Sequence, residues 1–295
     1  MFKTKRTIYL GLAAVLMFVS GAVFADGNYD STRMYGVTIT SILRLPETVE
    51  SLSKLPVKPT TRIVFDEWVD PQYYNDAIFQ INKVSYIMGE LLDSYAFNDY
   101  NIKDYKKRVN AYLNYFPDKV DIWEIGNEVN GEWLGNTDDV MEKVNAAFDI
   151  VEAKKQKTAI TFFYNLGCSE DPDNEMFKWI QTNIPKKMRT GLDYVFISYY
   201  DDQCNMGDPD WNQVFTILHI MFPNAKLGIG ECGAHDKGNA ETTIKKYYSM
   251  SVNNQSFVGG FFWWFFKRDC VPYTKPIWTV LSDAMKAYAI KQGGK

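Results

Sequence analysis

Short apolar runs alternate with longer amphipathic segments along most of the chain. The apolar runs show no strict alternation of apolar and polar positions, which is typical of parallel strands covered on both faces. We therefore predict eight strands, at residues 34–40, 61–65, 84–88, 120–125, 159–164, 194–199, 226–230 and 260–266.

The segments between these runs carry the apolar stripes and the start signals of helices. Asn101 is a candidate N-cap for one helix, and either Asn136 or Thr137 begins another. Asp210 precedes a further helix, and the last helix carries an apolar stripe from residue 277 to residue 288. Because no linker rich in Pro, Gly or Ser separates these elements, we expect a single domain.

Eight strands alternating with helices are the pattern of a (β/α)8 TIM barrel, an α/β fold of about 250 residues. An open, doubly wound parallel sheet is the alternative interpretation of the same alternation. In both folds the sites are built at the carboxyl ends of the strands. The polar residues that follow each strand are therefore the ones to examine.

Residues 1–25 have the pattern of a cleavable signal peptide: three basic residues, an apolar run over residues 8–19 and a small-residue cleavage site ending at Ala25. The alternative is an uncleaved membrane anchor, but the apolar run is shorter than the roughly 20 residues that a spanning helix needs. We therefore expect residues 26–295 to form a secreted or periplasmic catalytic barrel.

The charge of the chain argues against nucleic acid as a partner. The net charge is −4, and removal of the three basic residues of the signal segment takes it to −7. A protein that binds nucleic acid usually carries a basic patch. No other segment is long and apolar enough for a membrane span, so we expect no membrane contact after signal cleavage. We also expect a monomer.

Carboxylate and aromatic residues dominate the predicted strand ends. Acidic groups supply acid and base chemistry, and flat aromatic rings stack on the apolar faces of sugars, so this composition indicates a carbohydrate site. The chain has two His and no clustered ligands, which argues against a catalytic zinc, and we expect no cofactor. The strand-end residues are Ser41, Asp66, Glu67, Trp68, Glu90, Asn127, Glu128, Trp133, Asn165, Tyr200, Asp201, Asp202, Glu231, His235, Trp263 and Trp264.

Glu128 and Glu231 form the candidate catalytic pair. Glu128 follows the fourth predicted strand and Glu231 the seventh, and these strands lie on opposite sides of an eight-stranded barrel. Hydrolysis of a glycosidic bond needs two facing carboxyl groups, one as an acid and one as a nucleophile or base. Asn127, next to Glu128, is placed to bind a sugar hydroxyl beside the reacting carbon.

On these residues the chain resembles the clan A glycoside hydrolases, which are retaining (β/α)8 enzymes with an Asn-Glu pair ending strand four and a Glu ending strand seven. The resemblance covers essentially the whole of residues 26–295 in element order. It implies that Glu128 is the general acid/base, that Glu231 is the nucleophile and that Asn127 contacts the sugar 2-hydroxyl.

The same resemblance extends to residues that surround the pair. It implies that Arg62 is the arginine of strand two, that Tyr200 hydrogen-bonds the nucleophile and that Trp263 or Trp264 forms a sugar platform. The chain departs from the clan pattern at Ser198, where many members have His, and at Val129, where Pro is frequent. No individual family is assigned.

Several acidic, aromatic and histidine residues lie outside the candidate catalytic pair. Glu67 and Trp133 are additional candidate substrate contacts, although Glu67, like Glu90, fits a solvated loop at least as well. Glu124 lies inside the fourth strand, where a buried carboxylate needs a partner, and we predict that it pairs with Arg62. His219 is expected to be structural, and a solvated position is favoured for His235.

The four cysteines follow strands five to eight, in an exported protein where disulfides persist. Neighbouring loops favour bridges between Cys168 and Cys204 and between Cys232 and Cys270. A bridge between Cys204 and Cys232 is the alternative connectivity. We expect such bridges to stiffen the loops rather than to carry out thiol chemistry.

The leading hypothesis is a secreted retaining glycoside hydrolase that cleaves β-linked poly- or oligosaccharides by double displacement. The alternative is a barrel that binds carbohydrate without cleaving it, as part of a secreted or cell-surface assembly. The presence of both carboxylates favours the first. Glucan, mannan, xylan and galactan all suit an acidic, aromatic mouth, so the sequence leaves the glycan open.

Overall fold

The computed structural model describes residues 33–202 and 208–293 of the chain. The predicted signal peptide lies outside the described residues, and so does Cys204. Within the described ranges, none of the helices combines the length and the apolar character that crossing a membrane requires.

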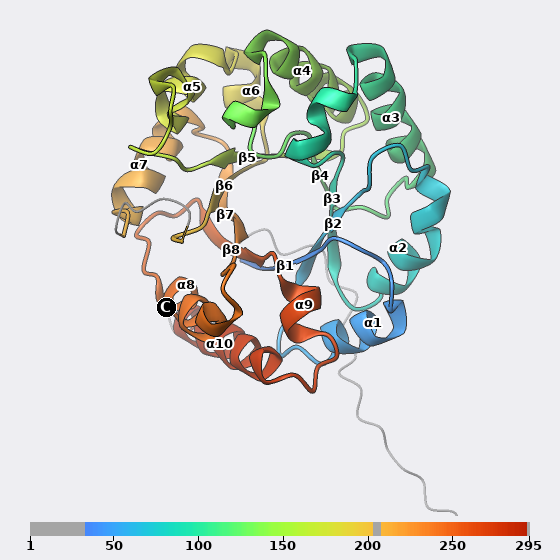
Figure 1. Cartoon of the computed structure of the whole chain (residues 1–295), viewed down its shortest axis with the longest axis vertical. Coiled ribbons are helices and arrows are strands. Elements are labelled where there is room, and N and C mark those ends of the chain that lie inside the picture. Colours follow the sequence, from blue (N-terminus) through green and yellow to red (C-terminus); the bar gives the residue numbers. More distant parts are fainter. Residues whose placement is uncertain (1–32, 203–207, 294–295) are drawn as a thin grey trace, which may run out of the picture.

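Eight parallel strands form a closed barrel in which each strand pairs with its neighbours in sequence and β8 pairs with β1 (Figure 1). The predicted (β/α)8 fold is thereby confirmed, and the open sheet is wrong. The strands are β1 Met34–Ile39, β2 Thr60–Val64, β3 Tyr86–Glu90, β4 Ile122–Glu124, β5 Lys157–Phe163, β6 Tyr194–Tyr199, β7 Lys226–Cys232 and β8 Phe257–Trp263.

Helices surround the barrel on all sides (Figure 1). Side-chain caps fix several of the starts as predicted: Asn101 accepts from the backbone N–H of Asp104, Asn136 caps α4, and Asp210 caps α7. The α-helices are α1 Leu45–Ser53, α2 Asn75–Ile81, α3 Ile102–Tyr115, α4 Thr137–Ala153, α5 Met176–Asn183, α6 Lys186–Gly191, α7 Trp211–Met221, α8 Ala240–Ser249, α9 Phe266–Cys270 and α10 Pro276–Gly293. Short 3-10 helices are η1 Pro71–Tyr74, η2 Ser94–Asp99, η3 Glu132–Leu134, η4 Pro172–Asn174 and η5 Lys237–Asn239.

Two strands are displaced from their predicted positions. β8 begins and ends three residues before the predicted run, and β3 lies two residues later than predicted. In β8 the aromatic run continues past the strand into α9, so apolar character does not mark the end of the strand. Gly259 and Gly260 both have positive φ inside β8, a backbone conformation that the prediction did not anticipate.

The barrel interior has two layers of different chemistry. One layer is apolar and fills the barrel as a packed core. The other, nearer the carboxyl ends of the strands, contains buried charged and hydroxyl groups, among them Arg62, Glu124 and Ser198. The apolar layer consists of Met34, Met88, Ile122, Ala159, Tyr194, Phe196, Val258 and Phe262.

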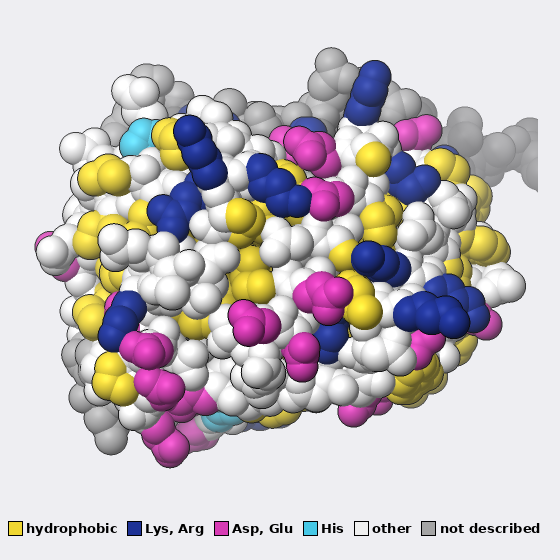
Figure 2. All heavy atoms as spheres, turned by 90° about the horizontal axis from the view of Figure 1, so that it is seen from above, with side chains coloured by type: hydrophobic (Ala, Val, Ile, Leu, Met, Phe, Trp, Pro, Cys, Tyr) yellow, Lys and Arg dark blue, Asp and Glu magenta, His cyan; other side chains and the backbone are white. Residues whose placement is uncertain are grey.

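The outer surface is polar where the helices face solvent. On the side shown in Figure 2, acidic and basic side chains are interspersed rather than separated into fields of one sign. The face shown there thus carries mixed charges, whereas the barrel interior contains an acidic cluster around Arg62.

Candidate active site

Arg62 on β2 is fully buried and is surrounded by three carboxyl groups. Its Nε lies 2.6 Å from Glu124 Oε2, its Nη1 lies 2.7 Å from Glu231 Oε2, and its Nη2 lies 3.1 Å from Glu90 Oε2. The predicted pairing of Glu124 with Arg62 is confirmed. Thr161 also donates to Glu124, which completes the partners of that carboxylate inside the barrel.

The interpretation of Glu90 as a solvated loop residue is wrong. Glu90 is the last residue of β3 and is completely buried, because the strand continues two residues further than predicted. Burial raises the pKa of Glu90 well above its ordinary value, and the nearby Arg62 only partly opposes this effect. One guanidinium cannot neutralise three carboxylates, so Glu90 is favoured in its neutral form.

A shift in strand register turns Glu231 toward the interior. Ile197 of β6 pairs with Ile229, but the next residue, Ser198, pairs with Glu231, so β7 contains one extra residue at Gly230. Such a bulge changes the face on which the following side chains lie. A Cβ atom at Gly230 would lie 2.5 Å from the Cβ of Phe196, so only glycine fits at this position.

Two donors hold the Glu231 carboxyl group. Arg62 Nη1 donates to Oε2 at 2.7 Å, and the Tyr200 hydroxyl donates to Oε1 at 2.9 Å. Burial raises the pKa of Glu231 above its ordinary value, whereas both donors lower it. Both contacts favour the ionised form, which is the form that a nucleophile needs.

Glu128 follows β4 and has a backbone φ of 49°, in the left-handed region that non-glycine residues seldom adopt. Ser198 donates to its Oε1 at 2.6 Å, and Ser94 donates to its Oε2 at 3.2 Å. Burial, followed by the negative charge of Glu231, raises the pKa of Glu128 to about 8, against a smaller lowering by Ser198. The protonated form of Glu128 is therefore favoured at neutral pH.

Asn127 lies beside Glu128 and is almost completely buried. Within the described part of the chain, its Oδ1 has no hydrogen-bond partner. A buried polar atom without a partner costs free energy, so its persistence here is consistent with an oxygen that accepts from a ligand.

Glu128 and Glu231 line one cavity of about 350 Å³. Of the other residues predicted for the site, Trp133, Tyr200 and Trp264 lie in its wall. Aromatic side chains thus border both carboxyl groups, as sugar binding requires. The full lining comprises Tyr95, Glu128, Trp133, Phe163, Cys168, Tyr200, Glu231, His235 and Trp264.

The sequence left open which strand-eight tryptophan faces the mouth. Trp264 lines the cavity, and its ring lies over the Arg62 guanidinium with 5.5 Å between the guanidinium carbon and the ring centroid. Trp263 instead is 1% exposed, and its Nε1 donates to Asp269 at 3.1 Å on the helix side of β8. Trp263 as a substrate contact is therefore wrong, because this last residue of β8 is buried against α9, whereas Trp264, one residue past the strand, lines the cavity.

The remaining predicted contacts lie at the edge of the site. Glu67 is exposed and lines an adjoining hollow together with Tyr95 and Trp264. His235 is half exposed and lies in the cavity wall, where its Nδ1 is 3.0 Å from Asp202 Oδ1. The solvated position favoured for His235 is thus confirmed by its exposure, but the side chain also lines the cavity.

Ser94, Tyr95 and Phe163 are site residues that sequence reasoning missed. Ser94 and Tyr95 belong to η2, after β3, and nothing in the local pattern separates them from other loop residues. Phe163 is the last residue of β5. Because successive side chains of a strand point to opposite faces, its position on the strand was the signal that could have placed it at the site. Among the described residues, no group of three or more His, Cys, Asp or Glu side chains is arranged to hold a metal ion.

The predicted bridge between Cys232 and Cys270 is wrong, since both are buried free thiols. Cys232 is the last residue of β7, and its Sγ is directed at the carbonyl oxygen of Phe262. It therefore lies in the hydrophobic core outside the interior layer of the barrel and not in a mouth loop. Cys168 is disulfide-bonded, but its predicted partner, Cys204, lies outside the described residues, so that pairing stays a prediction.

The barrel is similar to solved structures of Gas2p from Saccharomyces cerevisiae. The complex with laminaritriose and laminaritetraose has a TM-score of 0.54 at 13% identity, over 86% of this chain and 64% of that chain. The complex with laminaripentaose has a TM-score of 0.56 at 12% identity, over 88% of this chain and 66% of that chain. This chain thus spans less than two thirds of the length of those proteins. These neighbours bear out the resemblance to the clan A glycoside hydrolases at the level of the fold.

No protein-family model matches the chain, and no curated protein matches it in sequence. The likeness in fold and the geometry of the two carboxyl groups are two different observations. One describes the path of the backbone, and the other describes the chemistry at its carboxyl-terminal face.

Proposed function

We propose that this chain is a retaining glycoside hydrolase that cleaves β-glycosidic bonds of a poly- or oligosaccharide by double displacement. The observation that carries the proposal is the pair of buried carboxyl groups in one cavity, each with a different environment. Burial raises the pKa of both groups: together with the charge of Glu231 it takes Glu128 to about 8, whereas at Glu231 the donors Arg62 and Tyr200 oppose the rise and favour the anion. Two carboxyl groups set apart in this way are the acid and the nucleophile of glycoside hydrolysis.

In the first step, Glu231 attacks the anomeric carbon while Glu128 gives its proton to the departing oxygen. The new bond to the sugar removes the negative charge of Glu231. Since that charge is one cause of the raised pKa of Glu128, the pKa falls in the intermediate. Glu128 can then take a proton from the water that releases the sugar.

Arg62 and Tyr200 position the nucleophile in this scheme. Their donors occupy one lone pair on each oxygen of Glu231, which fixes the orientation of the carboxylate. Asn127 supplies a free buried oxygen for the hydroxyl next to the reacting carbon. Trp264 and Trp133 provide flat faces for the sugar rings on the cavity wall.

We propose a β-1,3-linked glucan as the first substrate to test. The support is that the structural neighbours were solved with laminari-oligosaccharides, which are short chains of β-1,3-linked glucose. The predicted signal peptide would export the chain to meet such a polymer. Export remains a prediction from the sequence.

The test measures new reducing ends from laminarioligosaccharides and from mannan, xylan and galactan. Glu128→Gln and Glu231→Gln should each lower kcat by about 10²- to 10⁴-fold without loss of fold, because each removes one acid–base or nucleophilic group. Glu50→Gln, an exposed change on α1, is the matched control and should leave activity intact. Full activity in either site variant would refute its assigned role.

Proton NMR of the first product separates the two stereochemical outcomes. Double displacement predicts that the β-anomer forms first, and an initial α-anomer would refute it. If the protein binds a glycan but releases no new reducing ends, the non-catalytic binding barrel is favoured instead.

A further inference from the structure

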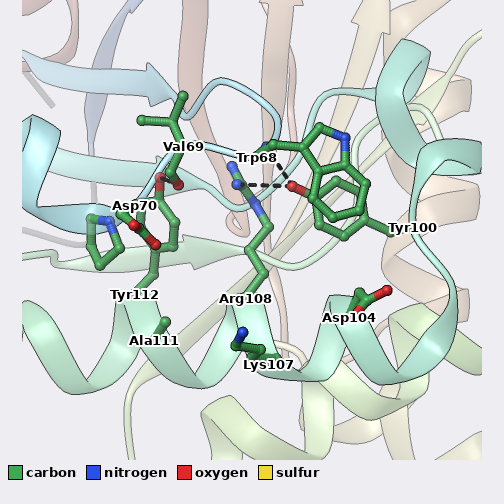
Figure 3. A pocket seen from close by; sticks show the side chains of 10 residues that line it. Trp68, Val69, Asp70, Tyr100, Asp104, Lys107, Arg108, Ala111 and Tyr112 are labelled. Atoms are coloured by element: carbon green, nitrogen blue, oxygen red, sulfur yellow. Dashed lines mark hydrogen bonds between the residues drawn. The ribbon is translucent and has the colours of Figure 1, made fainter.

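A second hollow lies on the outer flank of the mouth, between the loop after β2 and the N-terminal half of α3 (Figure 3). It encloses about 130 Å³. None of its lining residues belongs to the cavity that contains Glu128 and Glu231. The residues that matter here are Trp68, Asp70, Tyr100, Asp104, Lys107 and Arg108.

Trp68 is held flat and exposed at the edge of this hollow. Its side chain stacks on Tyr100 with ring centroids 4.0 Å apart and planes at 9°, yet Trp68 remains 60% exposed. Since Tyr100 covers one face, the exposed area belongs to the other face and the ring edges. The open indole face is a flat apolar surface on which a ligand ring can stack.

The backbone around Trp68 is braced in an unfavourable conformation. Trp68 has a φ of 58°, which is uncommon for a bulky residue. Its N–H donates to the Tyr100 hydroxyl at 2.5 Å, and Arg108 Nη1 donates to the same oxygen at 3.3 Å (Figure 3). Arg108 also donates to the carbonyl oxygens of Phe65 and Asp66. Strain that surrounding contacts maintain is characteristic of functional positions.

The loop after β2 links the hollow to a depression of about 300 Å³, because Glu67 lines the depression and the next residue, Trp68, lines the hollow. That depression shares Tyr95 and Trp264 with the catalytic cavity. Its other wall includes Glu67, which immediately precedes Trp68. A chain of sugars that extends from the catalytic cavity past Trp264 and along Glu67 would come to Trp68 as the next residue of the same loop.

We propose that the hollow at Trp68 is a second binding site for a neutral pyranose unit of the same polysaccharide that enters the catalytic cavity. The indole face takes the apolar side of the sugar ring, and Asp70, Asp104 and Lys107 at the edge bind its hydroxyl groups. The lining contains two acidic and two basic side chains, so their charges balance and suit an uncharged polyol. The inference rests on the proposed function, because the occupant is the proposed substrate.

The test compares Trp68→Ala, Trp68→Phe and the control Phe79→Ala, a 58% exposed aromatic on α2 outside the hollow. Two quantities are measured: retention in native gels that contain soluble laminarin, and the ratio of kcat/KM for laminarin to kcat/KM for laminaripentaose. Trp68→Ala should weaken binding and lower the ratio by about 3- to 10-fold, the usual size of one aromatic stacking contact. Trp68→Phe should recover most of the laminarin binding and most of the kcat/KM ratio. Phe79→Ala should match the wild type in both measurements.

The outcomes separate this inference from the proposed function. If the wild type hydrolyses laminarin and Trp68→Ala matches it in both measurements, the second site is overturned and the hydrolase stands. If the wild type is retained in a Trp68-dependent way without hydrolysis, the second site stands and the hydrolase is overturned. A wild type that neither binds nor cleaves laminarin, mannan, xylan or galactan overturns both. Thermal unfolding of each variant identifies loss of fold.

Discussion

Ser198→Ala tests the electrostatic account of Glu128 most directly. Ser198 Oγ donates to Glu128 Oε1 at 2.6 Å, both groups are buried, and this contact lowers the pKa that burial and Glu231 raise. The substitution removes the donor and adds no bulk. Because the hydrogen bond favours the carboxylate, its loss must favour the protonated form, and the pKa of Glu128 must rise above about 8.

The size of the rise follows from the strength of the bond. A hydrogen bond to a charged group contributes about 1.5–3 kcal/mol, and one pKa unit corresponds to about 1.4 kcal/mol. Ser94 still donates to the other oxygen at 3.2 Å and compensates in part. We therefore expect a rise of about one unit, at the lower end of that range.

The assay is the pH dependence of kcat/KM on a laminarioligosaccharide. Activity needs protonated Glu128, so the wild-type profile should fall as the pH rises through about 8, and the Ser198→Ala profile should fall about one unit higher. Ser94→Ala, which removes the longer bond, is the graded control and should move the limb less. An alkaline limb that stays in place in Ser198→Ala, or moves to lower pH, would refute the reasoning.

Three further predictions concern the surrounding structure. Arg62→Met should lower the free energy of unfolding by about 3–5 kcal/mol at pH 7, because it leaves buried carboxylates without their cation. The loss in urea denaturation should be smaller at pH 5 than at pH 7, because protonation of Glu90 and Glu231, whose pKa values burial raises, lowers the buried negative charge; an equal loss at both pH values would contradict the account. Trp263→Ala should cost about 3–5 kcal/mol of stability, whereas Trp264→Ala should mainly raise KM for oligosaccharides; a reversed pattern would exchange their roles. Cys232 and Cys270 should resist a thiol reagent in the native protein and react after denaturation, and rapid native labelling would show that they are not buried free thiols.

The sequence determined the fold through local patterns. Apolar runs without alternation predict buried parallel strands, and capping residues such as Asn101 and Asn136 fix the helix starts, because both signals depend on a few neighbouring residues. Eight such units close into a barrel. The sequence also placed Glu128 and Glu231 at the carboxyl ends of strands four and seven, since the order of strands in this barrel follows the order of the chain.

Only the tertiary structure decided which side of each strand a residue faces near its end. The extra residue at Gly230 turns Glu231 inward and Cys232 outward, and two more residues in β3 bury Glu90. A change of one residue reverses the face of every later side chain, so small errors in strand ends become large errors in the site. The partners of Glu128 depend on contacts between distant segments. The distance from Ser198 to Glu128 Oε1 is set by the closure of the barrel, which no local pattern in the sequence records.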